Sequence, residues 1–371
     1  MKILQLTAHY YPNVGGVETH LHDLVSGLIE RGNIITVLTY NPLTTNAKWQ
    51  LIERERKLLI VRLPWIKGFF YKLVRFPALE FLYLFPGLFI ITPFIILGRK
   101  IDVIHAHGLV AGAVGVFWSK ILNKRIIIST HSIYHFPTNG AYSLFVRWML
   151  VNADHVLCLS LQSKEEIVKL GIPKEKITVF TYWVDQDVFR KISHAKEKVG
   201  WEKKFVVLFV GRLVEEKGVK ILISAARSFN KNIYVAIAGV GPLQTFVEKA
   251  AKSNSHILYL GKLEQSELPL YYSAADVMII PSIHEEGFGR VILEALSCGV
   301  PVVASNRGAI PEAVDTTVAK LITISPKTII QSVEWLYKNP DNLKKMALLA
   351  REFAQKRYSD KNAAVIINTY K

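Results

Sequence analysis

The sequence predicts an α/β protein made of two doubly wound domains. Short apolar runs rich in β-branched residues alternate with helical patterns along almost the whole chain, which is typical of parallel strands joined by crossover helices. The alternation pauses between Tyr182 and Arg190 and then begins again, and 371 residues suit two domains better than one. We therefore expect two Rossmann-like domains whose sheets face each other, carboxyl ends inward, across a deep cleft.

The first half of the chain shows this pattern element by element. A strand is predicted at residues 2–8 (KILQLTA), and a helix at residues 17–32, where apolar side chains recur at helical spacing up to Gly32. The strand IITVLTY follows at residues 34–40. Further strands of this half are expected at residues 58–64, 102–107, 125–131, 154–160 and 177–180.

The second half repeats the alternation after the charged stretch SHAKEKVGWEKK. Its strands are expected at residues 205–211, 233–239, 256–261, 276–281 and 301–305. We place the domain boundary in the pause, so that an N-terminal domain covers residues 1–184 and a C-terminal domain covers residues 185–354.

Composition narrows the class of protein. Half of the residues are hydrophobic, which excludes a disordered or collagen-like chain. Cys158 and Cys298 lie in apolar runs and indicate reduced thiols in a cytosolic protein, and the start of the chain favours a strand over a signal peptide. The formal net charge of +16 is compatible with binding to nucleic acid, to an anionic membrane or to an anionic substrate.

One apolar segment, residues 63–100, interrupts the alternation. Its part from Phe81 to Gly98 carries no charge over eighteen residues, which approaches the length of a membrane span, but Pro86 and Pro93 interrupt it. We therefore expect a buried or surface-lying pair of helices.

Positive charge is concentrated in residues 56–100. This stretch contains a single acid, Glu80, and aromatic side chains such as Trp65 and Phe69. Its eight basic residues are Arg56, Lys57, Arg62, Lys67, Lys72, Arg75, Arg99 and Lys100. Basic, aromatic and aliphatic residues together are typical of a helix on an anionic lipid surface. The other interpretation, a helix packed on its own sheet, explains the apolar residues but not the charge.

The strongest candidate site lies at residues 276–305, DVMIIPSIHEEGFGRVILEALSCGVPVVAS. The run predicts a strand, a loop, a helix and another strand, with Glu286 in the loop and Glu294 in the helix. Residues 287–289 offer backbone N–H groups at the helix N-terminus, where a phosphate is favoured. Two carboxylates around a phosphate-binding turn suit a nucleotide sugar, although an isolated pair of acids is more often solvated.

A second motif, GRLVEEKG at residues 211–218, directly follows a predicted strand. It brings Arg212 and Lys217 to the mouth of the same cleft. A guanidinium and an ammonium group there can neutralise a diphosphate leaving group. Taken alone, the two side chains would be ordinary surface charges.

The N-terminal domain offers a glycine turn and a histidine. Gly15 and Gly16 lie between the first strand and the first helix, where they permit close approach of the backbone to a ligand. Neither this turn nor GVGP at residues 239–242 is a GxGxxG fingerprint, so a nicotinamide-dependent oxidoreductase is disfavoured. His131 ends the strand of residues 125–131 and faces either the site or the backbone of a neighbouring loop.

Together, PNVGGVE, THSIY, GRLVEEKG and EEGFGRVILEALSCGVPVVAS resemble the motifs of glycosyltransferase family 4, the retaining two-domain enzymes of GT-B fold. The resemblance runs from Met1 to about Tyr370. Within this family, the sequence is similar in particular to the lipid-glycosylating branch, such as phosphatidylinositol mannosyl- and N-acetylglucosaminyltransferases. It implies an acceptor on the N-terminal domain, a nucleotide sugar on the C-terminal domain, and a last helix, residues 355–371, that crosses back to the N-terminal domain.

The resemblance also implies the roles of single residues. The implied catalytic residues are His131, Arg212, Lys217 and Glu286. His131 would lie next to the anomeric centre, and Glu286 would contact the sugar hydroxyls. The implied donor-binding residues are Gly15, Gly16, Arg212, Lys217, Glu286, Gly287, Phe288, Gly289, Arg290 and Glu294. Of these, Arg212 and Lys217 would bind the diphosphate and Glu294 the ribose.

No cofactor and no metal ion is implied, and the donor would be a sugar nucleotide such as a GDP- or UDP-sugar. Asp185 and Asp187 look like the DxD metal motif of a different glycosyltransferase fold. They fall in the connector between the domains, and we expect them to be structural.

We expect a retaining transferase that moves a hexose or an N-acetylhexosamine to a lipid or lipid-linked acceptor on the cytoplasmic face of a membrane. Because no side chain is a convincing nucleophile, we expect front-face attack with stabilisation of the departing diphosphate. A soluble disaccharide synthase of the same family stays open as an alternative. A sugar-nucleotide epimerase shares the architecture without these motifs, and nucleic-acid binding is disfavoured because no corresponding motif occurs.

Overall fold

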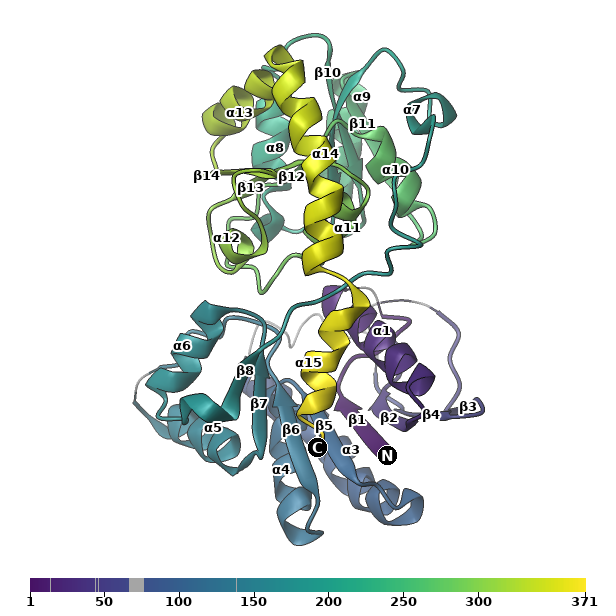
Figure 1. The fold of residues 1–371 in the computed structure, drawn as a ribbon, viewed down its shortest axis with the longest axis vertical. Helices are drawn as coiled ribbons and strands as arrows, with labels where there is room; N and C mark the ends of the chain where they lie inside the picture. The colour runs from purple at the N-terminus through teal and green to yellow at the C-terminus, as the bar shows by residue number, and fades with distance from the viewer. Residues whose placement is uncertain (14, 44, 46, 67–76, 138) are drawn as a thin grey trace. The chain divides into compact units, whose positions relative to one another are not determined.

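The computed structural model of the chain describes residues 1–13, 15–43, 45, 47–66, 77–137 and 139–371. These residues form two compact units (Figure 1). The first unit comprises Met1–Thr181 together with Lys361–Lys371, and the second comprises Tyr182–Asp360. Each unit is built on a sheet of mainly parallel strands with helices on both faces, so the predicted doubly wound α/β class is confirmed.

The sheet of the first unit has eight strands in the order β3-β4-β2-β1-β5-β6-β7-β8. They are β1 (Lys2–Thr7), β2 (Ile34–Tyr40), β3 (Ile52–Arg54), β4 (Leu58–Leu63), β5 (Val103–His107), β6 (Arg125–Ser129), β7 (His155–Cys158) and β8 (Ile177–Val179). All neighbours are parallel except β3 and β4. β1 lies between β2 and β5, so the strand order runs outward from β1 to both edges of the sheet. Doubly wound sheets bind their ligands at the carboxyl end of the strands where the order reverses in this way.

The helices of the first unit cover both faces of this sheet. They are α1 (Gly16–Glu30), α3 (Pro77–Arg99), α4 (Leu109–Ile121), α5 (Ala141–Asn152), α6 (Leu161–Lys169) and α15 (Ala363–Asn368). On one face α3 contacts α4 and α4 contacts α5, while α1 and α15 contact each other on the opposite face (Figure 1). The end of the chain therefore packs beside its first helix.

Within the described residues, the apolar segment contributes one helix, α3, which continues through Pro86 and Pro93. The expected second helix of the pair would fall on residues that the structure does not describe. A proline cannot donate to the carbonyl four residues earlier. For Pro93 that carbonyl belongs to Phe89, and it accepts a hydrogen bond from Nε1 of Trp118 on α4 at 2.9 Å. A neighbouring helix thus satisfies the group that the proline leaves free, and residues 67–76 lie outside the described residues.

The positive charge of residues 56–100 is only partly on the surface. Arg62 is 1% exposed, and its guanidinium bonds to the Glu53 carboxylate at 2.7 Å and to the carbonyl of Tyr11 at 2.8 Å. The expectation that Arg62 contacts lipid is therefore wrong, because its guanidinium is buried and hydrogen-bonded inside the first unit. Lys67, Lys72 and Arg75 lie outside the described residues.

The second unit has six parallel strands in the order β11-β10-β9-β12-β13-β14. They are β9 (Phe205–Val210), β10 (Ile233–Ala238), β11 (Ile257–Gly261), β12 (Val277–Ile280), β13 (Val302–Ser305) and β14 (Ala319–Ile322). Its helices are α7 (Ala195–Lys198), α8 (Val219–Ala226), α9 (Gln244–Ser253), α10 (Leu268–Ala274), α11 (Arg290–Ser297), α12 (Ile310–Ala313), α13 (Pro326–Lys338) and α14 (Pro340–Arg357). The order reverses between β9 and β12, and both predicted site motifs directly follow these two strands.

Candidate functional site

The Glu-x7-Glu motif lies at the carboxyl edge of the second sheet. β12 ends at Ile280, residues 281–289 form a loop, and α11 begins at Arg290. Gly289 precedes α11 with φ 72°, a left-handed conformation that residues with a Cβ rarely adopt. The loop and the first turn of α11 are therefore at the position where such a sheet binds its ligand.

Lys217 and Glu286, which are distant in sequence, form an ion pair in this loop region. Nζ of Lys217 lies 2.5 Å from Oε1 of Glu286, and the hydroxyl of Ser282 donates a hydrogen bond to the same oxygen. Burial alone would raise the pKa of Glu286, but the charge of Lys217 and the hydrogen bonds from Lys217 and Ser282 outweigh it and lower the pKa. Glu286 is therefore a carboxylate at neutral pH and holds the lysine side chain in place.

Two loops hold this ion pair together through their backbones. The N–H of Ile283 donates to the carbonyl of Glu216 at 2.9 Å. Gly218 has φ 70°, and a Cβ at this position would lie 1.8 Å from the carbonyl oxygen of Pro281. Because no side chain fits there, glycine at position 218 allows the loop that carries Lys217 to approach the loop that carries Glu286.

Glu294 forms a buried ion pair with Arg290, which lies one turn earlier on α11. Its Oε1 accepts from Nε of Arg290 at 3.1 Å, and its Oε2 accepts from the hydroxyl of Tyr272 at 2.9 Å. The side chains of Arg290 and Glu294 are 4% and 7% exposed. Arg290 also donates to the carbonyl of Trp183 at 3.2 Å, which ties α11 to the segment that enters this unit. Tyr272 and Trp183 were not among the predicted site residues.

The remaining predicted donor residues have different surroundings. Phe288 is 4% exposed, and its ring lies 6.2 Å from that of Tyr182 and 6.0 Å from that of Tyr358, measured between centroids. Its side chain therefore anchors the loop, and the glycines on either side offer backbone groups alone. Arg212 lies two residues after β9 with an exposed side chain. Among the described residues, no hydrogen bond or ion pair joins Arg212 to Lys217 or Glu286.

In the first unit, His131 belongs to a network of buried polar side chains. It comes two residues after β6 and is 8% exposed. Its Nε2 lies 3.0 Å from Nδ1 of His107, and Nε2 of His107 lies 2.6 Å from Oε1 of Gln5. An amide oxygen only accepts, so Nε2 of His107 carries the proton, its Nδ1 accepts, and Nε2 of His131 donates. Gln5 on β1 thereby fixes the tautomer of His131 through His107 on β5.

The C-terminal segment completes the same network. The hydroxyl of Tyr370 lies 2.7 Å from Nδ1 of His105, and Nε2 of His105 lies 2.7 Å from Oγ of Ser129. Nε2 of Gln5 also donates to the Tyr370 hydroxyl at 3.5 Å. Burial lowers the pKa of His105 and of His131 to about 3, and burial together with the neighbouring histidines lowers the pKa of His107 well below its usual range. The three imidazoles are therefore neutral at neutral pH.

Acid is expected to destabilise the first unit through these histidines. The unfolded chain binds protons near the usual pKa of about 6.5, whereas the folded chain does not. Their contribution is fully present above that pH and is lost below it, by about 1.4 kcal/mol per pH unit for each histidine. Urea unfolding at about pH 5.5 and about pH 4.5 measures this slope. His107→Asn should reduce the slope by one histidine's share and the exposed His194→Asn should not; equal slopes in all three proteins would contradict the expectation.

The glycine turn before α1 has a neighbour that the sequence analysis missed. A Cβ on Gly15 would lie 2.2 Å from Oε2 of Glu18, so this carboxylate lies against the turn. The ring of His20, also on α1, is 6.0 Å from that of His131. Helix α1, which begins at Gly16, thus brings the glycine turn and His131 into one region of the first unit.

Asp185 closes a turn in the connector. Its Oδ1 accepts hydrogen bonds from the backbone N–H groups of Asp187 and Val188 at 2.8 and 3.2 Å. Gln186, between the two aspartates, donates to Oγ of Ser297 at 3.0 Å. In the part of the chain that the structure describes, no group of three or more His, Cys, Asp or Glu side chains is placed to hold a metal ion.

Two Rossmann-like units in one chain, with a cation and a carboxylate at the carboxyl edge of the second sheet, define the class of GT-B glycosyltransferases. Family models agree over nearly the whole length. The model described as Glycosyltransferase Family 4 matches residues 14–188, and that described as Glycosyl transferases group 1 matches residues 191–353. The chain belongs to glycosyltransferase family 4, as its motifs predicted.

Relatives and solved structures match this chain over most of its length. An uncharacterised glycosyltransferase of Methanocaldococcus jannaschii is 28% identical, over 92% of this chain and 87% of the relative. The phosphatidylinositol N-acetylglucosaminyltransferase GPI3 subunit of Saccharomyces cerevisiae is 26% identical, over 88% of this chain and 75% of the subunit. The structure of Anabaena HepE in complex with UDP has the same fold, with a TM-score of 0.78 and 22% identity over 100% of this chain and 99% of that one.

Proposed function

We propose that this glycosyltransferase is a retaining enzyme that moves a hexose or an N-acetylhexosamine from a nucleotide-diphosphate sugar to a lipid or lipid-linked acceptor at the cytoplasmic face of a membrane. The observation that carries the donor half of the proposal is the buried pair of Lys217 and Glu286 beside the glycine-flanked loop that opens α11. It places a cation, a carboxylate and unshielded backbone N–H groups together, which suits a diphosphate linked to a sugar.

Each group of this pair has a part in the proposed reaction. Lys217, with Arg212 from the same loop, neutralises the charge that develops on the departing diphosphate. Both hydrogen bonds to Glu286 engage Oε1, so Oε2 is the oxygen that accepts from a sugar hydroxyl. Glu294 accepts from the ribose hydroxyls in exchange for one of its present partners. We assign His131 of the first unit to the anomeric centre and the leaving phosphate to the acceptor proton. Because Lys217 and Arg212 supply the positive charge for the diphosphate, we expect the reaction to need no metal ion.

Two observations support a lipid acceptor over a free sugar. The yeast relative is by its name a phosphatidylinositol N-acetylglucosaminyltransferase subunit. Among the described residues, the part of α3 from Phe81 to Arg99 is long and apolar enough to cross a membrane. Only 33% of this apolar stretch is buried. An exposed apolar surface of this kind would bind the enzyme to the bilayer that contains a lipid acceptor.

The proposal is tested by supplying labelled UDP- and GDP-sugars with either phosphatidylinositol-containing vesicles or free sugars, with and without EDTA. We expect the label in the lipid fraction, an anomeric configuration equal to that of the donor by NMR, and no effect of EDTA. Full activity on free sugars without lipid would identify a disaccharide synthase instead. An inverted product would overturn the front-face mechanism.

A further inference from the structure

Helix α3 exposes a continuous apolar stripe. Leu82, Ile90, Phe94 and Leu97 are 71%, 58%, 70% and 62% exposed. Their spacing of three, four or eight residues puts them on one side of the helix. The opposite side of α3 is buried in the core of the first unit, where Leu84, Leu88 and Ile96 are fully buried. The stripe is therefore a surface feature and not a packing face.

The stripe extends sideways onto α4 and α5. On α4, Phe117 and Ile121 are 40% and 57% exposed, and on α5 Leu144 and Trp148 are 65% and 45% exposed. Phe89 of α3 joins the helices, because its ring lies 4.9 Å from that of Phe117. We call the exposed side chains of α3, α4 and α5 the three-helix face. A contiguous apolar face of this extent marks an interaction site.

Among the described side chains of α3, α4 and α5, the exposed charged ones are basic. Arg99 after the stripe, Lys120 on α4 and Arg147 on α5 are exposed. Neither α4 nor α5 contains an acid, and the single acid in α3 is Glu80. A second copy of the chain docked by a twofold axis would place this basic face against itself. An anionic lipid surface offers both the apolar layer and the opposite charge.

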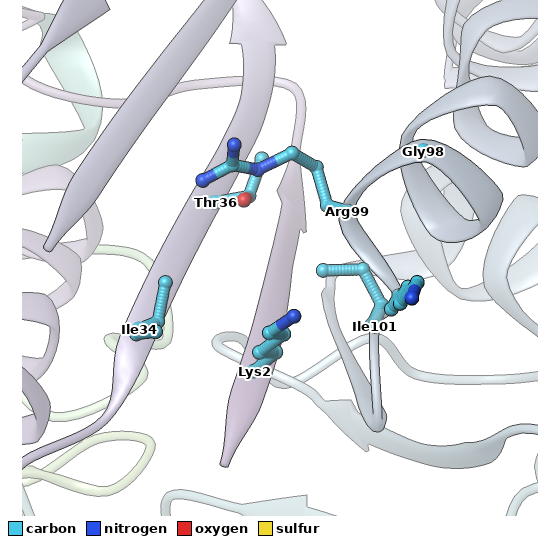
Figure 2. A pocket seen from close by; sticks show the side chains of 7 residues that line it. Lys2, Ile34, Thr36, Gly98, Arg99 and Ile101 are labelled. Carbon is cyan, nitrogen blue, oxygen red and sulfur yellow. The ribbon is translucent and has the colours of Figure 1, made fainter.

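A small cavity lies where the stripe ends. It has a volume of about 310 Å³ and opens at the start of β1 and β2, beside the last turn of α3. Figure 2 shows Lys2, Thr36 and Arg99 among the side chains that line it, and Lys100 also belongs to the lining. The carboxylate of Asp102 is engaged nearby, where it accepts the backbone N–H of Lys2 at 2.7 Å. Three cationic side chains at the end of an apolar stripe suit a lipid phosphate.

We propose that the three-helix face docks the chain on an anionic bilayer, with the stripe of α3 at the level of the acyl chains and the cavity around Lys2 and Arg99 receiving a lipid phosphate. This proposal specifies which surface of the first unit contacts the membrane. It rests on the proposed function, because that function requires a membrane as the partner. It keeps the α3 part of the expected contact through residues 56–100 and extends it to α4 and α5.

The test is co-sedimentation of the full chain with vesicles of phosphatidylcholine alone or with phosphatidylglycerol added. We expect binding that needs phosphatidylglycerol. Phe94→Asp with Leu97→Asp, and separately Arg99→Glu with Lys100→Glu, should each lower the partition coefficient at least roughly tenfold. Matched changes on the second unit, Leu348→Asp at a side chain that is 67% exposed and Lys231→Glu at an exposed one, should leave it unchanged. Far-ultraviolet circular dichroism confirms that each variant is folded.

Two results would overturn the docking proposal. One is vesicle binding that survives both double substitutions. The other is a dimer in light scattering that Phe94→Asp converts to a monomer, without vesicle binding, which would make the face a self-association surface. Failure of the proposed function has a different signature: vesicle binding as expected together with transfer to free sugars alone. Conversely, transfer to lipid in detergent without vesicle binding would remove only the docking proposal.

Discussion

Lys217→Ala is expected to lower the rate of glycosyl transfer roughly 100-fold or more while the chain stays folded. The substitution removes the cation that we place on the departing diphosphate. It also leaves Glu286 with Ser282 as its remaining hydrogen-bond donor in a buried position. Because the charge of Lys217 is what keeps the pKa of Glu286 low against the effect of burial, the acidic limb of the pH–rate profile should move to higher pH. Initial rates of transfer and of donor hydrolysis across pH measure both effects.

The matched control is Lys220→Ala. Lys220 also pairs with a glutamate, Glu215, but its side chain is 46% exposed and that of Glu215 is 58% exposed. Exposed pairs contribute little, so transfer and stability should both stay close to those of the unchanged protein. Arg212→Ala should resemble Lys217→Ala in activity. If transfer and hydrolysis survived both the Lys217 and the Arg212 substitution unaltered, the assignment of the diphosphate site would be wrong.

Glu294→Ala is expected to cost about 3–5 kcal/mol in the free energy of unfolding. Its carboxylate is the partner of Arg290, whose side chain is 4% exposed, and it also accepts the hydroxyl of Tyr272. Removal of the acid leaves a guanidinium in a buried place with the carbonyl of Trp183 beside it. Urea unfolding followed by tryptophan fluorescence measures the loss.

The control is another acid–base pair with the same i, i+4 spacing, which lies on a helix surface. Glu334 and Lys338 form an i, i+4 pair on α13, with side chains 24% and 64% exposed. Glu334→Ala should change the free energy of unfolding by less than about 0.5 kcal/mol. A comparable loss in the two variants would mean that the burial of the Arg290–Glu294 pair does not account for the effect of Glu294→Ala.

That Lys217 and Glu286 lie together could be predicted because both residues are close in sequence to strand ends. Glu286 follows β12 and Lys217 follows β9, and a doubly wound sheet brings the carboxyl ends of neighbouring strands together. The fold class follows from the same regular alternation. The pattern did not predict the partners of Arg290 and Glu294. Tyr272 and Trp183 belong to other segments of the chain and contact α11 only in the folded unit.

The network around His131 could not be predicted in the same way. Gln5, His107 and Tyr370 come from three distant parts of the chain. The register of β1 and β5 brings the first two together, and the packing of α15 against α1 brings Tyr370 to them. The one local signal was DVIHAH, in which two histidines two residues apart share a face of a buried strand. The continuity of α3 was missed for a similar reason, because the indole of Trp118 that compensates Pro93 belongs to another helix.

The bond from Tyr370 to His105 also bears on the order in which the protein is assembled during synthesis. The first strand leaves the ribosome at the start of translation, yet its Gln5 meets Tyr370 only after 365 further residues have been added. Until then His105 and Gln5 lack one partner, and α1 lacks α15 beside it. The histidine network of the first unit therefore cannot be complete until the second unit has been translated, because residues 182–360 separate Tyr370 from the rest of the first unit.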